Sequence, residues 1–246
     1  MSGIFRGRAG WAARLMLVTL ALLAASALAA PVPGRADTRY PVLLVHGGGG
    51  RPSDFAMMQR WLADDGYTSF TVDLDPPATD VKKGAETIAA RVTDIQRLTN
   101  PAHPSTVKIH LVGHSMGGLS ARYYLKVLGG LGNVATYTAL GSPQHGSVLG
   151  CVTVPDQCPG NQVLRDLNHG DDTPGSVYYT SIGSTDEPVE SNGTLTRLDG
   201  GACLPLVKGG LHAFEPRDPV IYRAVLDGLI SQCPPGRFTT LKDLPD

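Results

Sequence analysis

Residues Val107 to Leu128 read VKIHLVGHSMGGLSARYYLKVL and carry the pattern G-x-S-x-G. A β-branched, apolar run of strand length precedes the pattern, and a run of helix length rich in Leu, Ala and Tyr follows it. This context predicts a nucleophile elbow, a sharp strand-to-helix turn that exposes the hydroxyl group of Ser115. A side chain at Gly113 or Gly117 would meet neighbouring backbone. The helix would direct its free amides and positive dipole end beside the hydroxyl.

The first thirty residues are typical of a secretory signal peptide. Three arginines precede an uncharged apolar run that starts at Leu15 and ends in the small-residue sequence ALA at 27–29. We expect cleavage after Ala29 or Ala30, or after Ala36. The run is short for a membrane span, and no basic cluster follows it, so a membrane anchor is disfavoured. The sequence therefore predicts a secreted, extracellular protein.

Charge and length limit what the rest of the chain can be. The first thirty residues hold three arginines and no acidic residue, so their removal changes the net charge from −1 to −4. No Lys- or Arg-rich block remains, which excludes nucleic acid as an expected partner. The length suits one α/β domain, predicted over 40–232 after a leader at 31–39 and before a tail at 233–246. We expect a monomer.

Strand-like and helix-like segments alternate along the domain. Expected strands cover 40–45, 67–72, 107–112, 134–140, 177–182 and 202–207, and expected helices cover 53–64, 80–98, 116–128, 162–167 and 219–231. This alternation predicts an α/β fold with a mostly parallel sheet and helices on both faces. Ligands bind such sheets at the carboxyl ends of the strands, where the glycine run 47–50, Ser115 and residues 141–143 would meet. Residues 141–175 form an irregular segment.

Four cysteines lie in the C-terminal half of the chain. Export from the cell and an even count imply disulfides, for which three connectivities exist. We favour Cys151–Cys158, which closes a short loop, and Cys203–Cys233, which ties a late strand to the last helix. A zinc site is the rival interpretation, but no C-x-x-C spacing supports it, so we predict no metal site.

A serine nucleophile needs a base, and the base needs an orienting acid. In this kind of fold the chain order is serine, acid, histidine, with the last two on loops after late strands. His212 is the best base, because it follows the last expected strand and precedes the last helix. His145 and His169 lie in the irregular segment and are weaker candidates.

Asp186 is the favoured acid, because it stands just past a strong strand. Asp199 is the runner-up, although an aspartate before two glycines also suits a simple turn. Asp171 and Asp172 precede the strand and fit less well. Glu187 is adjacent to Asp186, but its side chain should point in a different direction.

An oxyanion hole needs two backbone donors. One is expected to be the amide of Met116, directly after the nucleophile. The other should come from the glycine run after the first strand, with Gly48 favoured and Gly47 as the alternative. A phosphate cradle is the competing interpretation of this run. It is disfavoured because the run lacks both a Lys-Ser/Thr ending and the spacing G-x-G-x-x-G.

Taken together, five motifs resemble the small secreted bacterial lipases and esterases of the α/β-hydrolase superfamily: VHGGGG (45–50), GHSMGG (113–118), YTSIGSTD (179–186), TRLDG (196–200) and GLH (210–212). The resemblance covers roughly 40–231. It implies that Ser115 is the nucleophile, His212 the base and Asp186 the orienting acid, with oxyanion amides from Gly48 and Met116. It also implies a minimal fold with a truncated cap. The cysteines depart from the family pattern and leave the behaviour of a lid open.

The leading hypothesis is therefore a serine carboxylic-ester hydrolase that needs no metal or organic cofactor and acts on acyl esters, chiefly of lipids, with transient contact to lipid interfaces. Polyester or cutin hydrolases, acyltransferases, thioesterases and peptidases share the same triad. From another class, a non-catalytic secreted binding protein on a hydrolase scaffold is the alternative. Such proteins usually lose a triad residue, whereas this chain keeps a complete candidate set.

Overall fold

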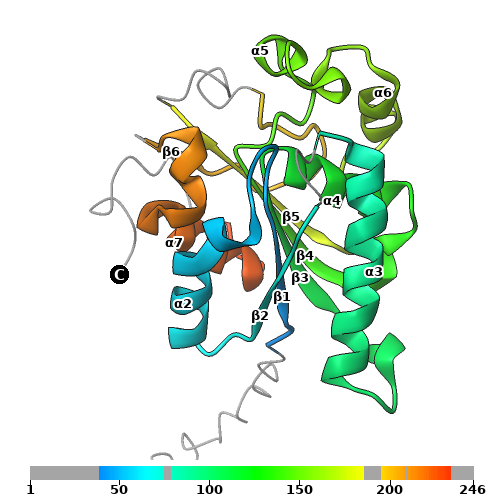
Figure 1. Cartoon of the computed structure of the whole chain (residues 1–246), viewed down its shortest axis with the longest axis vertical. Helices are drawn as coiled ribbons and strands as arrows, with labels where there is room; N and C mark the ends of the chain where they lie inside the picture. The colour runs from blue at the N-terminus through cyan, green and yellow to red at the C-terminus, as the bar shows by residue number, and fades with distance from the viewer. Residues whose placement is uncertain (1–38, 75–78, 186–194, 209, 234–246) are drawn as a thin grey trace, which may run out of the picture. The chain divides into compact units, whose positions relative to one another are not determined.

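The computed structural model describes residues 39–74, 79–185, 195–208 and 210–233. Within them a parallel sheet has the strand order β2-β1-β3-β4-β5-β6 (Figure 1). The strands are β1 (Val42–Val45), β2 (Ser69–Val72), β3 (Ile109–His114), β4 (Val134–Leu140), β5 (Tyr178–Ser184) and β6 (Leu206–Val207). The predicted α/β architecture with a mostly parallel sheet is confirmed.

Both faces of the sheet are covered, as the apolar strand sequences require. In β1, Leu43 and Val45 belong to one hydrophobic cluster, whereas Val42 and Leu44 belong to the other, and all four side chains are completely buried. Successive side chains of a strand point to opposite faces, so a strand without polar residues needs helices on both sides.

The helices divide between the two faces (Figure 1). Helices α3 (Val81–Thr99) and α4 (Met116–Lys126) supply the first cluster, and α2 (Ala56–Asp64) and α7 (Pro219–Leu229) supply the second. Side chains cap two of these helices: Asp80 accepts the Lys83 amide at the start of α3, and Asp218 accepts two amides at the start of α7.

Two short helices lie in the irregular segment after β4: α5 (Val148–Cys151) and α6 (Gln162–Asn168). The sequence predicted α6 but not α5. Both disulfides have the predicted pairing, Cys151–Cys158 across the α5 loop and Cys203–Cys233 beside β6. Figure 1 shows this segment beyond the end of the sheet at which β3 leads into α4.

Short 3-10 helices connect these elements at Pro52–Phe55, Pro104–Thr106, Gly130–Asn133, Pro155–Gln157 and His212–Arg217. The last strand is shorter than the predicted span 202–207. Cys203 forms only an isolated bridge with Thr180, and ladder pairing resumes at Leu206. Pro205 has no N–H group and interrupts the ladder. Among the described residues, no helix has the length and apolar character to cross a membrane.

The strand order positions the site. β1 lies between β2 and β3, so the chain leaves β1 toward one side of the sheet and returns on the other. Such a reversal opens a crevice at the carboxyl ends of β1 and β3. The glycine run follows β1 and Ser115 follows β3, and both therefore border this crevice.

Candidate active site

Ser115 occupies a strained turn between β3 and α4. Its backbone has φ 52° and ψ −123°, a conformation that residues with a side chain rarely adopt. The glycines on either side allow the turn. A Cβ atom at Gly113 would lie 2.7 Å from the Gly118 backbone, and one at Gly117 would lie 2.3 Å from the carbonyl oxygen of His46. This is the geometry that the G-x-S-x-G pattern predicted.

The fold brings His212 to this serine from 97 residues further along the chain. Its Nε2 lies 2.9 Å from Ser115 Oγ. His212 begins the 3-10 turn that precedes α7. A neutral imidazole that carries its proton on Nδ1 accepts the serine proton at Nε2. The distance is thus suited to proton transfer between the predicted nucleophile and the predicted base.

A third ionisable group, Glu215, lies near this pair and was not predicted from the sequence. The carboxylate of Glu215 is completely buried, and its Oε2 lies 3.6 Å from His212 Nδ1 and 3.3 Å from His114 Nε2. Glu215 follows His212 by three residues within the same 3-10 turn. The only signal in the sequence was an acidic residue three positions after the candidate base. Because Glu215 directly precedes Pro216, the pattern was also that of an ordinary surface residue.

His114 supports the segment that carries the base. Its Nε2 lies 2.9 Å from the carbonyl oxygen of His212. Burial, followed by the proximity of His212, lowers the pKa of His114 to about 3, so the ring is neutral near pH 7. A neutral ring that is protonated at Nε2 donates a hydrogen bond to that carbonyl and anchors the His212 backbone beside the elbow.

The acid assignments have different outcomes. Asp186 and Glu187 lie outside the described residues; β5 ends at Ser184. Asp199 places its Oδ2 3.4 Å from His145 Nε2. The runner-up candidate for the acid thus faces one of the less favoured candidates for the base. Asp172 forms a buried ion pair with Arg122, with Oδ1 2.9 Å from Nη2.

The other weaker candidates lie at the surface. Asp171 is exposed, and its Oδ1 accepts the backbone amide of Thr173. His169 is also exposed, and its carbonyl oxygen accepts a hydrogen bond from the Lys126 ammonium group.

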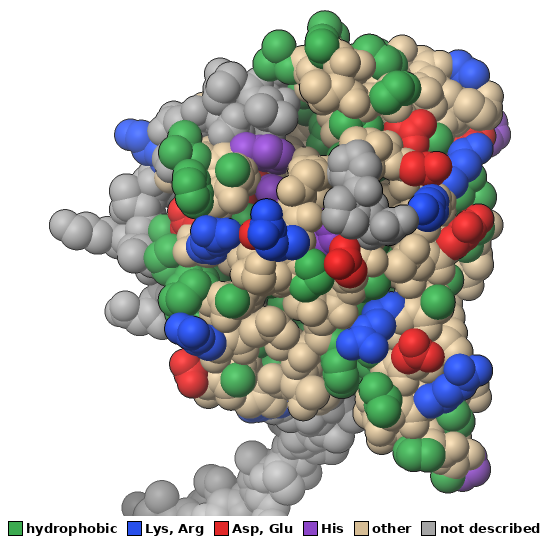
Figure 2. All heavy atoms as spheres, viewed as in Figure 1, with side chains coloured by type: hydrophobic (Ala, Val, Ile, Leu, Met, Phe, Trp, Pro, Cys, Tyr) green, Lys and Arg blue, Asp and Glu red, His purple; other side chains and the backbone are tan. Residues whose placement is uncertain are grey.

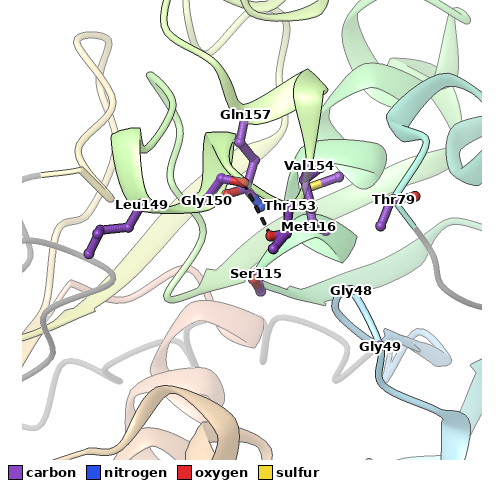
Figure 3. Close-up of a pocket in the computed structure, with 10 residues that line it drawn as sticks. All are labelled: Gly48, Gly49, Thr79, Ser115, Met116, Leu149, Gly150, Thr153, Val154 and Gln157. Carbon is purple, nitrogen blue, oxygen red and sulfur yellow. Dashed lines mark hydrogen bonds between the residues drawn. The ribbon is translucent and has the colours of Figure 1, made fainter.

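A cavity of about 410 Å³ opens beside Ser115 (Figure 3). Gly48 and Met116, the two predicted oxyanion donors, both line it. Met116 is the first residue of α4, and first-turn amides have no acceptor within their own helix. The α5 segment, residues 147–158, supplies much of the remaining wall, through Leu149, Gly150, Thr153, Val154 and Gln157.

The glycine run is held in place by His46. Its Nε2 accepts the Leu74 amide at 3.0 Å, so the ring proton is on Nδ1 and donates to the Gly47 carbonyl oxygen at 2.9 Å. A Cβ atom at Gly47 would lie 2.9 Å from the Cβ of Ser115. Gly47, the alternative donor, therefore packs directly against the serine, while Gly48, the favoured donor, lines the cavity.

Two groups of side chains in the described part of the chain have the composition and spacing of metal ligands: His114, His212 and Glu215; and His145, Asp172 and Asp199. The first group surrounds the candidate base. An ion between Glu215 and His212 would bind Nδ1 of His212, the nitrogen that must carry the proton while Nε2 accepts the one from Ser115. The second group includes neither Ser115 nor His212.

Comparison with known proteins gives a family. The model of the alpha/beta hydrolase family matches residues 42–240. A triacylglycerol lipase of Burkholderia plantarii is 32% identical over 133 residues, 51% of this chain and 35% of that protein. A triacylglycerol lipase of Vibrio cholerae is 28% identical over 170 residues, which cover 63% of this chain and 52% of that protein. The chain thus spans about a third to a half of the length of these curated relatives.

Solved structures show the same fold at low sequence identity. The mature form of the Bacillus licheniformis lipase BlEst2 superposes with a TM-score of 0.61 at 18% identity, covering 81% of this chain and 96% of that one. Aspergillus fumigatus lipase B gives a TM-score of 0.65, also at 18% identity, covering 80% and 54%.

Proposed function

The chain belongs to the alpha/beta hydrolase family, and from this membership we propose that it is a secreted serine hydrolase of carboxylic esters, acting on acyl esters of lipids. The observation that carries the proposal is the 2.9 Å contact between Ser115 Oγ and His212 Nε2 at a strained elbow. Nucleophilic catalysis by serine requires this pairing of hydroxyl and imidazole.

In the proposed mechanism, Ser115 Oγ attacks the ester carbonyl carbon while His212 Nε2 takes the hydroxyl proton. The amides of Gly48 and Met116 bind the oxyanion of the tetrahedral intermediate. The carbon–oxygen bond to the alcohol then breaks, and His212 returns its proton to the leaving alcohol. Water, deprotonated by the same imidazole, hydrolyses the acyl-enzyme. Asp186 orients and stabilises the imidazolium.

Apolar surface at the cavity supports lipid as the substrate class. Val148, Leu149 and Val152 of the α5 segment are 75%, 61% and 85% exposed, and Leu149 also lines the cavity. Leu211 and Phe214, on either side of the base, are exposed as well. Figure 2 shows hydrophobic side chains gathered over α5. Exposed apolar patches of this kind favour contact with lipid interfaces. The curated relatives are named as triacylglycerol lipases.

Secretion is proposed from the signal-peptide pattern of the first thirty residues and from the two disulfides. Disulfides persist in oxidising environments outside the cytosol. N-terminal sequencing of the exported protein tests this proposal, with the mature chain expected to begin between residues 30 and 37.

The test of the activity is Ser115→Ala in the exported protein. We expect kcat on p-nitrophenyl esters to fall by about 10⁴-fold or more, because the nucleophile acts as a unit with its base. Covalent labelling by a fluorophosphonate probe should disappear with it. The matched control is Ser176→Ala at an exposed loop position, which should keep both. Full hydrolysis by the Ser115→Ala variant would contradict the proposal.

Substrate class is tested separately, with soluble esters of increasing acyl length, emulsified triglyceride and polyester film. A preference for acyl chains long enough to fill the cavity, with higher rates on emulsions than on monomeric substrate, is the expected result. A preference for polyester, or for an alcohol acceptor over water, would instead identify a polyester hydrolase or an acyltransferase.

A further inference from the structure

Three side chains that do not belong to the Ser115–His212 pair converge from separate segments of the chain. His145 follows β4, Asp172 precedes β5, and Asp199 lies in the segment 195–201 after it. The Nε2 atom of His145 lies 3.4 Å from Asp172 Oδ2 and 3.4 Å from Asp199 Oδ2. The three residues are far apart in the sequence, and the tertiary fold brings their side chains together.

The spacing of these atoms is that of metal ligands. An N–H···O hydrogen bond has a donor–acceptor distance of about 2.7–3.2 Å, so 3.4 Å to both carboxylates is long for such bonds. A zinc ion binds nitrogen and oxygen ligands at about 2.0–2.2 Å in a tetrahedron. That geometry separates two ligand atoms by about 3.3–3.5 Å. Both observed distances lie within that range.

The surroundings orient the ligands as a metal site requires. Arg122 holds Asp172 Oδ1 at 2.9 Å, and Asp172 Oδ2 accepts the Asp199 amide at 3.0 Å. The Asp172 residue is only 4% exposed, so its carboxylate is fixed with Oδ2 toward His145. Side chains that hold a ligand from behind are typical of metal sites. The His145 and Asp199 side chains are 34% and 82% exposed, which leaves a path for an ion and a water ligand.

We propose that His145, Asp172 and Asp199 bind a zinc ion with water as the fourth ligand. One imidazole and two carboxylates suit zinc, whereas calcium requires six to eight oxygen ligands. The two carboxylates and Arg122 give the cluster a net charge of −1 with neutral His145, so a divalent cation is attracted. The ion ties the segment 195–201 to the connection between α6 and β5.

The test uses the exported protein after treatment with a chelator. Zinc is titrated by calorimetry, bound metal is counted by elemental analysis, and Tm is followed with and without zinc. We expect about one zinc per chain and a rise in Tm of about 5 °C or more at a hundredfold excess over Kd. Asp199→Asn and His145→Asn should each weaken zinc binding at least tenfold, with ester hydrolysis unchanged in the metal-free protein.

Asp94→Asn and His169→Asn are matched controls, because each replaces an exposed residue of the same type. Both should bind zinc as the unchanged protein does. Less than a fifth of an equivalent of zinc at saturation would overturn the proposal. So would zinc that binds equally to all variants and inhibits hydrolysis, because it would place the ion at His114 and His212. Ser115→Ala should bind zinc as the unchanged protein does. Its effect on ester hydrolysis therefore tests the proposed hydrolase function alone.

Discussion

Glu215 places a buried carboxylate beside two imidazole rings. Its Oε2 faces Nδ1 of His212, the nitrogen opposite the one that contacts Ser115. In the proposed mechanism His212 becomes positively charged as the serine attacks, and a negative charge in a buried setting stabilises that state. Glu215 is therefore expected to act on the base in addition to Asp186.

Glu215→Gln tests this effect, because it keeps the shape and removes the charge. We expect kcat/KM to fall roughly tenfold, equivalent to about 1.4 kcal/mol of transition-state stabilisation. Glu86→Gln, at an exposed position on α3, is the control. An unchanged rate in a stable variant would refute the role.

Gly113 tests the steric basis of the elbow. A Cβ atom there would lie 2.7 Å from backbone atoms of Gly118, which cannot move without shifting α4. Gly113→Ala should lower the free energy of unfolding by about 2–3 kcal/mol, in the range for overpacked cores. Gly132→Ala, where a Cβ meets nothing within 4 Å, should change it by less than about 0.5 kcal/mol. Urea unfolding measures both, and equal effects would contradict the steric argument.

At the scale of the elements, the α5 segment combines exposure with covalent restraint. Its aliphatic side chains face solvent at the cavity, and Cys151–Cys158 closes the loop that carries them. A further hydrogen bond caps α5, from the Gly150 amide to Ser147 Oγ. If the apolar surface contacts a lipid interface, as proposed, these restraints limit the entropy that the loop loses on contact.

The two disulfides should differ in their contribution to stability. They close loops with sequence separations of 7 and 30 residues. Loop-closure entropy gives about 2–3 kcal/mol for Cys151–Cys158 and about 3–4 kcal/mol for Cys203–Cys233. Replacing both cysteines of each pair by serine should therefore lower Tm more for the second pair, as calorimetry would show. A larger loss from the Cys151–Cys158 pair would contradict the loop-length argument.

At the scale of the whole molecule, buried histidines link stability to pH. His110 lies in β3, hydrogen-bonded to Thr136 Oγ1 at 2.9 Å, and burial lowers its pKa to about 4. In the unfolded chain the pKa is 6.5, so between pH 6.5 and 4 the unfolded state binds the proton more readily. The stability of the folded protein therefore falls as the pH falls through this window, by up to about 1.4 kcal/mol per pH unit.

His110→Asn should flatten this dependence. Urea unfolding at pH 4.5, 5.5 and 6.5 measures the slope, whatever the substitution does to stability at neutral pH. His103→Asn, at an exposed position, should leave the slope unchanged. Equal slopes for the His110→Asn variant and the unchanged protein would show that His110 does not titrate as argued.

Local patterns predicted much of the architecture. The parallel sheet, both hydrophobic faces and the Asp218 cap follow from periodicity, capping chemistry and chain order. Of the three possible cysteine connectivities, the favoured one is confirmed. The short helix α5 was missed, because four residues leave no periodic pattern. The reduction of the last strand to two residues was missed as well, because the apolar run 202–207 looked continuous. In the structure Pro205 still accepts a hydrogen bond through its carbonyl oxygen but cannot donate one.

The sequence by itself determined the elbow, because a strand, two glycines and a helix are adjacent along the chain and their sterics are local. It also singled out His212, since chain order in this kind of fold is limited. Only the tertiary structure decided that His212 Nε2 reaches Ser115 Oγ, that Glu215 faces Nδ1, and that His145 meets two aspartates. Those contacts join distant segments, and side-chain direction and burial there depend on packing that no local pattern encodes.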